Sequence, residues 1–301
     1  MIDILNTDLD LINSAIGSPL ADCPAAINSV GEQRAKKQVA SQFNRAARSY
    51  DEAARIQHFS ASELAKQIQQ RESHQQKNIS GHWLDLGCGT GFSVPTLLQQ
   101  GVQSITGADL AHGMCLVSNE KLSQLPFHAV TADAENLPFA EESFDGIYSN
   151  LMVQWSEKID DLFAEAQRVL KSGGLFAFAT LGPRTMHELK SAWQQVDPFV
   201  HVNRFRSKQQ VTEQCEIFFD IESIHQQEVV QQHESLSCLL KELKAIGATN
   251  VNSGRRPGLG GRERLKQLDK AYRNVCDSDR TSPSTRLPLT YDLIWVVARK
   301  R

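Results

Sequence analysis

The sequence has little that would cross a membrane, form a disulfide framework or bind a metal. No apolar run approaches the roughly 20 residues that a transmembrane helix needs. The first residues show neither a basic segment followed by an apolar core nor a cleavage site. The six cysteines are scattered without a Cys-x-x-Cys pair, which is typical of free thiols in a reducing compartment. We therefore expect a cytoplasmic protein without a signal peptide, a metal site or membrane contact.

Neither charge nor composition is extreme for the chain as a whole. Its 301 residues suit one large α/β domain with additions, or two small domains. The net charge is −3, but residues 255–301 hold twelve Lys and Arg against five acids, so they carry +7 and the preceding residues −10. A basic end of this kind is usually a solvated face, but it can also steer an anionic partner. We discount nucleic acid as that partner because the whole chain is acidic.

A glycine-rich loop is the most informative feature that is present. The apolar stretch Trp83–Leu86 leads into Gly87, Gly89 and Gly91, and a helical pattern begins at Phe92. Glycines allow a tight turn and a close approach of the backbone to a ligand, and the helix N-terminus behind them favours negative charge. A dinucleotide fingerprint would read Gly-x-Gly-x-x-Gly. Because the third glycine comes one place early here, the loop favours a different nucleoside ligand.

Two acidic residues follow at the ends of the next apolar segments. Asp109 lies in Thr106–Leu110, the end of the next apolar stretch, and an acid at the tip of the second strand can accept hydrogen bonds from both ribose hydroxyls. Asp133 follows a third apolar segment. Dehydrogenases and methyltransferases both use an acid such as Asp109, so this residue alone does not separate the two classes.

Taken in order, these signals resemble class I S-adenosylmethionine-dependent methyltransferases. The resemblance implies that an acid after the third strand binds the adenine amino group and that the next backbone N–H serves the ring. It implies S-adenosyl-L-methionine as the cofactor. The implied cofactor-binding residues are Asp85, Gly87, Gly89, Gly91, Asp109, Leu110, Asp133, Ala134 and Asn150.

Strand and helix patterns alternate through the middle of the chain, which predicts parallel strands with right-handed crossovers. We expect a Rossmann-like, seven-stranded, mostly parallel sheet with helices on both faces, an N-terminal helical lid and a helical insertion after strand five. Helices are expected at 33–57 and 60–70, with a linker at 69–80. Residues 1–33 lack clear periodicity and contain turn formers, so we expect a mobile tail there. One methyltransferase domain is expected at 34–301. Its parts are a lid (34–75), a cofactor-binding core (82–180), a substrate-side insertion (183–210) and the C-terminal part of the sheet (211–301).

Longer stretches resemble one family more specifically, the malonyl-acyl-carrier-protein O-methyltransferases of early biotin synthesis. The matching runs are Phe43–Asp51, Ser149–Trp155, Thr180–Pro183, His201–Phe205 and Pro288–Tyr291. The run Ser149–Trp155 is far more specific than the glycine loop. The resemblance covers about residues 34–301 and implies that the free carboxyl of a malonyl thioester is methylated. The thioester would be carried by acyl carrier protein or coenzyme A.

The chemistry implied by this resemblance needs no general base, since the malonyl carboxylate is already an anion. The protein has to align that oxygen behind the sulfonium methyl and exclude water. The candidate catalytic residues are Tyr50, Trp155, His201 and Arg204. The candidates for substrate or carrier binding are Arg45, Gln154, Lys244 and Arg255.

Other interpretations stay open from the sequence. Tyr50 and Trp155 could serve packing alone, and His201 and Arg204 could be surface residues of a polar loop. A methyltransferase for a small carboxylic acid or a quinone precursor would share the glycine loop and both acids. A non-catalytic cofactor-binding protein is a third possibility. Methyl transfer from labelled cofactor would separate these classes.

Overall fold

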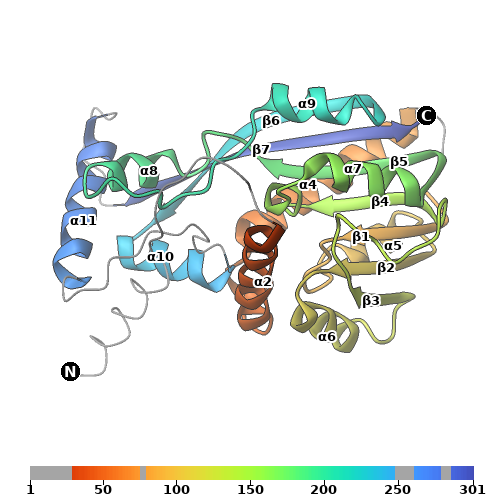
Figure 1. Cartoon of the computed structure of the whole chain (residues 1–301), viewed down its shortest axis with the longest axis horizontal. Helices are drawn as coiled ribbons and strands as arrows, with labels where there is room; N and C mark the ends of the chain where they lie inside the picture. Colours follow the sequence, from red (N-terminus) through yellow and green to blue (C-terminus); the bar gives the residue numbers. More distant parts are fainter. Residues whose placement is uncertain (1–28, 75–78, 248–260, 279–285) are drawn as a thin grey trace.

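The structure is a computed structural model, and it describes residues 29–74, 79–247, 261–278 and 286–301. Its centre is a seven-stranded sheet in the order β3-β2-β1-β4-β5-β7-β6 (Figure 1). The strands are β1 (His82–Leu86), β2 (Ser104–Asp109), β3 (Phe127–Thr131), β4 (Phe144–Asn150), β5 (Leu170–Leu181), β6 (Phe219–His233) and β7 (Leu287–Lys300). Strands β1 to β5 pair in parallel, whereas β7 runs antiparallel to both of its neighbours. The predicted fold class is confirmed.

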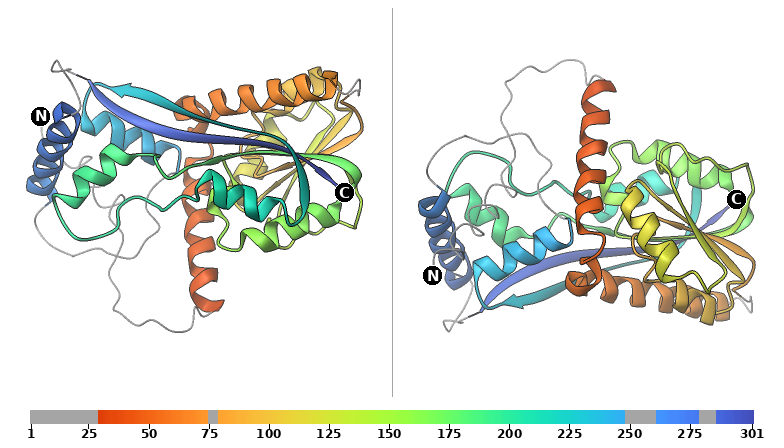
Figure 2. Two further views of the ribbon diagram at one scale, coloured as in Figure 1. Left: turned by 90° about the horizontal axis from the view of Figure 1, so that it is seen from above. Right: turned by 90° about the horizontal axis from the view of Figure 1, so that it is seen from below.

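Helices cover both faces of this sheet. The helices are α2 (Ser29–Ala46), α3 (Tyr50–Ala53), α4 (Arg55–His74), α5 (Val94–Gln99), α6 (His112–Lys121), α7 (Ile159–Val169), α8 (His187–Gln194), α9 (Lys208–Cys215), α10 (Leu236–Ala245) and α11 (Gly261–Ser278). Helix α4 lies along one face, and α7 and α9 lie along the other (Figure 2). None of the helices in the described ranges is long and apolar enough to cross a membrane.

The apolar run of β7 explains how the sheet is held between two cores. Residues Leu293, Trp295 and Val297 pack into the core shared with α4, while Ile294 and Val296 pack into the core shared with α7. Successive side chains of a strand point to opposite faces, so an unbroken apolar run is the pattern of a strand that is buried on both sides.

Strands β6 and β7 extend beyond the rest of the sheet. The pairing of β5 with β7 ends at Leu181 and Leu293, but β6 and β7 stay paired as far as His233 and Leu287. Helices α8, α10 and α11 lie around this extension, at the opposite end of the molecule from the C-terminus (Figure 1). Within the described part of the basic end, α11 and the C-terminal residues of β7 therefore lie at opposite ends of the molecule (Figure 1).

Three expected boundaries differ in the structure. The helix expected at 33–57 is broken after Ala46, where Ser49 N donates to Ala46 O in a turn. Helix α4 begins at Arg55 and continues to His74, so the expected linker at 69–80 is helical in its first half. The sequence of residues 69–74 is polar, and a solvent-exposed helix face can have the same composition as a linker, so composition alone did not distinguish the two. Most of the expected tail at 1–33 lies outside the described residues.

Candidate active site

A cavity of about 1060 Å³ lies over the carboxyl ends of the central strands. Parallel strands bring their carboxyl ends to one edge of a sheet, and ligands of open α/β sheets bind there. The lid helices and the segment after α8 complete the walls. Representative lining residues are Gly87, Asp109, Asp133 and Asn150 from the sheet edge, Phe43, Tyr50 and Gln57 from the lid, and Phe199 and Arg204 from the segment after α8.

The glycine loop turns from β1 toward this cavity. Gly87, Gly89 and Gly91 have φ values of 78°, 51° and 72°, in the left-handed region that favours glycine. A Cβ on Gly87 would collide with Met152, and one on Gly91 would collide with Leu122, whereas one on Gly89 would project into open space. Gly87 and Gly89 line the cavity and Gly91 does not. Gly91 thus serves close packing, and Gly89 leaves room for a ligand beside the backbone.

Asp109 holds the loop and faces the cavity at the same time. Its Oδ2 accepts from Gly89 N at 2.9 Å, and its Oδ1 accepts from Ala111 N at 2.8 Å. Burial raises the pKa of Asp109, and the two backbone hydrogen bonds act against that shift. A carboxylate has about four acceptor positions, so acceptor capacity remains for vicinal hydroxyls. This geometry fits the ribose of a nucleoside.

Asp85, in β1, does not line the cavity. Its side chain is buried, and burial, with the Asp109 charge adding to it, raises the pKa of Asp85 to about 7. Leu110 and Ala134, by contrast, are both part of the cavity wall.

Two amide oxygens at the cavity lack partners among the residues that the structure describes. They are Oδ1 of Asn150 and Oε1 of Gln57, and both residues line the cavity. Asn150 Nδ2 donates to Gln57 O at 3.0 Å, which ties the end of β4 to the start of α4. Buried acceptors without partners fit a ligand that carries hydrogen-bond donors. The sequence analysis did not single out Gln57, because nothing in its helical surroundings distinguishes it.

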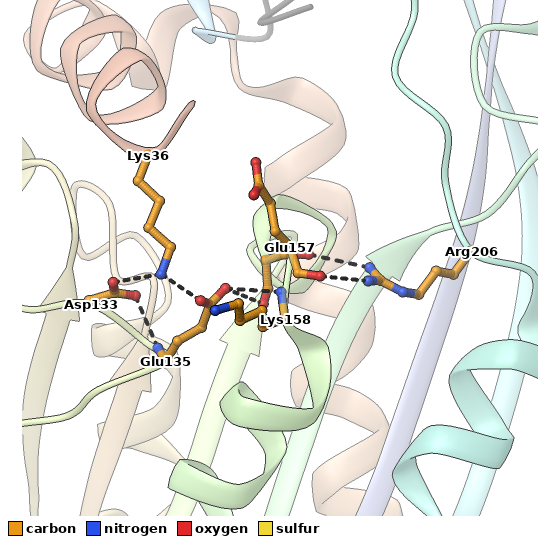
Figure 3. A network of polar contacts seen from close by, with 7 residues as sticks. Lys36, Asp133, Glu135, Glu157, Lys158 and Arg206 are labelled. Atoms are coloured by element: carbon orange, nitrogen blue, oxygen red, sulfur yellow. Dashed lines mark hydrogen bonds and ion pairs between the residues drawn. The ribbon is translucent and has the colours of Figure 1, made fainter. Parts of the chain in front are cut away.

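An ionic network joins the lid to the acid after β3 (Figure 3). Lys36 Nζ of α2 donates to Asp133 Oδ2 at 2.7 Å and to Glu135 Oε2 at 2.5 Å. Burial lowers the pKa of Lys36, but its hydrogen bonds to the two carboxylates outweigh this and raise the pKa. Glu135 also accepts from Ser156 Oγ at 2.7 Å. Lys36 and Glu135 were missed by the sequence analysis.

The same network reaches the segment after α8. Arg206 donates to the backbone oxygens of Ser156 and Glu157, each at 3.4 Å (Figure 3). The lid, the β3–β4 loop, the β4–α7 loop and this segment therefore meet around the cavity.

Aromatic side chains form the wall between the lid and the loop after β4. Phe43 lies edge-on to Trp155 with ring centroids 5.4 Å apart, and its centroid is 6.3 Å from that of Tyr50. Both Tyr50 and Trp155 line the cavity, as does Gln154. Burial raises the pKa of Tyr50, so this side chain stays a neutral phenol.

His201 lies outside the cavity lining, in contrast to its neighbour Arg204. Its ring stacks on Trp193 with centroids 3.9 Å apart, and its Nε2 is 2.7 Å from Asp197 Oδ1. Asp197 also pairs with Arg264 of α11. Burial lowers the pKa of His201, although Asp197 opposes the shift. These contacts give His201 a structural position that joins α8 to α11.

Two of the remaining candidates for substrate or carrier binding, Arg45 and Lys244, do not line the cavity. Arg45 is exposed and donates to Ser41 Oγ at 3.2 Å. Lys244 is exposed on α10. Arg255 lies outside the described residues.

Comparisons with solved structures agree with this architecture. The YcgJ protein of Bacillus subtilis superposes with a TM-score of 0.59 at 18% identity and covers 81% of this chain and 99% of that chain. A methyltransferase described as putative, from Bacillus halodurans, has a TM-score of 0.53 at 18% identity, covering 73% of this chain and 92% of that one. Residues 84–178 match the family model described as a methyltransferase domain.

Curated relatives identify the family. A malonyl-[acyl-carrier protein] O-methyltransferase of Serratia marcescens is 36% identical over 79% of this chain and 88% of its own length. One from Yersinia pestis is 33% identical over 87% of this chain and 91% of its own length. The chain belongs to the malonyl-[acyl-carrier protein] O-methyltransferase family.

Members of this family also occur as parts of longer proteins. The biotin biosynthesis bifunctional protein BioHC of Teredinibacter turnerae is 38% identical over 88% of this chain. The chain spans about half the length of such bifunctional relatives, 47% in this case.

Proposed function

We propose that the chain is an S-adenosyl-L-methionine-dependent carboxyl O-methyltransferase. Its substrate is the free carboxyl of a malonyl thioester on acyl carrier protein, and its products are the malonyl methyl ester and S-adenosylhomocysteine. The observation that carries the proposal is a single cavity that combines a nucleoside-type edge with an aromatic chamber, in a chain of this family. The reaction belongs to an early step of biotin synthesis, for which we propose a cytoplasmic location.

The residues at the sheet edge fit the cofactor. Asp109 would hold the ribose hydroxyls, and Asp133 with the Ala134 N–H would hold the adenine. The open space at Gly89 and the amide oxygens of Asn150 and Gln57 would receive the amino-acid part. When bound, S-adenosyl-L-methionine supplies a methyl group on a positively charged sulfur.

The residues of the chamber serve alignment and water exclusion. A malonyl carboxylate is an anion above a pH of about 5, so no side chain has to remove a proton from it. Tyr50 and Trp155 close the wall of the chamber, which keeps water from the reacting oxygen. Arg204 adds a cation at the cavity wall. His201 is not part of this chamber, because its ring lies outside the cavity and against Trp193.

The carrier protein would dock on α11. Arg262, Lys266 and Lys270 are exposed and four residues apart, so they lie on one face of the helix. A stripe of positive charge suits a small acidic partner. The long phosphopantetheine arm of a carrier allows docking at a distance from the reacting carboxylate. Helix α11 is part of the basic stretch 255–301 that was expected to dock the carrier, and the expected contribution of Arg255 stays a prediction because that residue lies outside the described ranges.

The test is methyl transfer from labelled cofactor to malonyl-acyl carrier protein, malonyl-coenzyme A or small carboxylic acids. The proposal expects a base-labile methyl ester on the malonyl carrier, with slower transfer to coenzyme A. Preferred transfer to a small acid would favour the second enzyme class named from the sequence. Cofactor binding without transfer to any acceptor would contradict an enzymatic role.

A further inference from the structure

Three tyrosines are almost completely enclosed in the described structure, and one of them differs in its hydrogen bonding. Tyr148 Oη donates to Ala61 O at 3.2 Å, and Tyr272 Oη donates to Pro288 O at 2.6 Å. The side chain of Tyr291 is equally buried, at 2% exposure, but its hydroxyl has no partner in the described ranges. Burying an unpaired hydroxyl costs stability, so this group calls for a functional explanation.

The unpaired hydroxyl belongs to the one of these three tyrosines that lines the cavity. Tyr291 lies on β7, on the same face as Leu293, and two residues beyond the last pair that β7 forms with β5. Three apolar residues, Leu181, Met186 and Ile246, belong to the same core cluster as Tyr291 and also line the cavity. Apolar side chains offer the hydroxyl no acceptor, and a bound ligand can do so.

The charged groups near Tyr291 are committed to other partners. Glu242 pairs with Arg55 at 2.6 Å and lies 3.7 Å from His233 Nδ1, and Glu188 accepts from Thr290 Oγ1 at 2.5 Å. Burial, together with the charge of Glu242, raises the pKa of Tyr291 well above its usual value. The group is thus a neutral phenol, and it meets a ligand oxygen as a hydrogen-bond donor.

The position of Tyr291 along β7 indicates which oxygen of a malonyl thioester its hydroxyl could reach. Asn150, at the cofactor end, is level with Ala179 of β5, and Ala179 is level with Trp295 of β7. Tyr291 is four residues farther out, which corresponds to roughly 13 Å along a strand. A malonyl thioester has its free carboxylate at the methyl-donor end and its thioester carbonyl farther along the chain. The outer position therefore suits the carbonyl.

We propose that Tyr291 Oη donates a hydrogen bond to the thioester carbonyl oxygen of the malonyl substrate. The bond would hold one end of the malonyl group, and so direct the free carboxylate toward the cofactor. The inference rests on the proposed function and adds to it a residue that positions the substrate and selects for an acyl thioester.

The test compares Tyr291→Phe with the wild type on two ligands of the carrier protein. One is the malonyl thioester, and the other is a 2-carboxyethyl thioether, in which a methylene replaces the carbonyl. Dissociation constants are measured on the enzyme loaded with S-adenosylhomocysteine, and kcat/KM is measured for the malonyl thioester. Loss of one neutral hydrogen bond should weaken malonyl binding and kcat/KM about tenfold, while thioether binding should change less than twofold.

A stability control separates this role from packing. Tyr291→Phe removes a hydroxyl that has no hydrogen-bond partner among the described residues, so the Tm should stay the same or rise. Tyr272→Phe, at a hydroxyl bonded to Pro288 O, should lower the Tm. Equal losses of affinity for the two ligands would overturn the proposed role of Tyr291 but leave the proposed function intact. A wild-type enzyme that methylates no malonyl thioester would overturn the proposed function, and this inference with it.

Discussion

Asp85 is a buried acid that makes stability depend on pH. Its pKa in the folded protein is about 7, whereas that of an unfolded aspartate is about 3.9. Between these values the folded state binds more protons than the unfolded state, so stability falls as the pH rises from about 4 to 7. Asp85→Asn removes this titration. We expect the unfolding free energy of the variant, relative to the wild type, to increase between pH 4.5 and 7.5 in urea titrations.

Asp145 is a control residue for which the pH dependence of stability should have the opposite sign. Its pKa is lowered, because the Lys171 ammonium and the His82 N–H outweigh the effect of burial. A lowered pKa contributes stability above the unfolded value and loses it as the pH falls. Asp145→Asn should therefore be more destabilising at pH 7.5 than at pH 4.5. Parallel pH profiles for the wild type and Asp85→Asn would show that Asp85 does not titrate in this range.

Asp109 is expected to contribute directly to cofactor affinity. Asp109→Asn keeps one oxygen for a backbone N–H but removes the charge and an acceptor. Calorimetric titration should show S-adenosyl-L-methionine binding weakened by about 1–3 kcal/mol, the range for a lost charge-assisted hydrogen bond. Asp161→Asn, on the exposed side of α7, is the matched control. Unchanged affinity in a folded Asp109→Asn protein would remove this residue from the site.

At the scale of elements, α2 is the part of the lid whose attachment is easiest to test. Lys36 connects it to two carboxylates across the cavity, while the adjacent Lys37 is exposed. Lys36→Met keeps the aliphatic stem and removes the ion pairs, which for partly exposed pairs contribute about 0.2–1 kcal/mol each. We expect amide hydrogens of α2 to exchange roughly two- to thirtyfold faster in this variant, because the two pairs together contribute about 0.4–2 kcal/mol. Lys37→Met should leave the exchange unchanged, and equal rates in both variants would argue against a Lys36 attachment.

At the scale of the whole molecule, docking on α11 predicts a salt-dependent effect on one substrate. Lys266→Glu combined with Lys270→Glu should raise the KM for malonyl-acyl carrier protein more than that for malonyl-coenzyme A. The difference should shrink with added salt, because exposed charges are screened beyond about 10 Å at 0.1 M. Lys66→Glu with Lys171→Glu, on other exposed surfaces, is the charge-matched control. An equal rise for both substrates would indicate a distorted site, and no rise would leave α11 a solvated face.

The sequence by itself determined the features that depend on local order. Apolar strands alternating with helices specify a parallel sheet, and the glycines at Gly87 and Gly89 specify a turn with positive φ. Asp109 ends β2 and Asp133 follows β3, so parallel pairing of these strands brings both acids to one edge without any knowledge of distant contacts. These inferences are reliable because backbone sterics and strand direction act over a few residues.

Only the tertiary structure decided which distant side chains meet. Lys36 lies 97 residues before Asp133, and Gln57 lies 93 residues before Asn150, so no periodicity signals either contact. Tyr291 and His201 both occur in runs that resemble the family. The hydroxyl of Tyr291 has no partner among the described residues and lies at the cavity, whereas the ring of His201 packs against Trp193. The basic residues of α11 and those at the end of β7 lie far apart, because the long strand β7 carries the chain from one end of the molecule to the other. Such outcomes depend on how lid, insertion and sheet pack together, and a side chain's partners are set by that packing rather than by its neighbours in sequence.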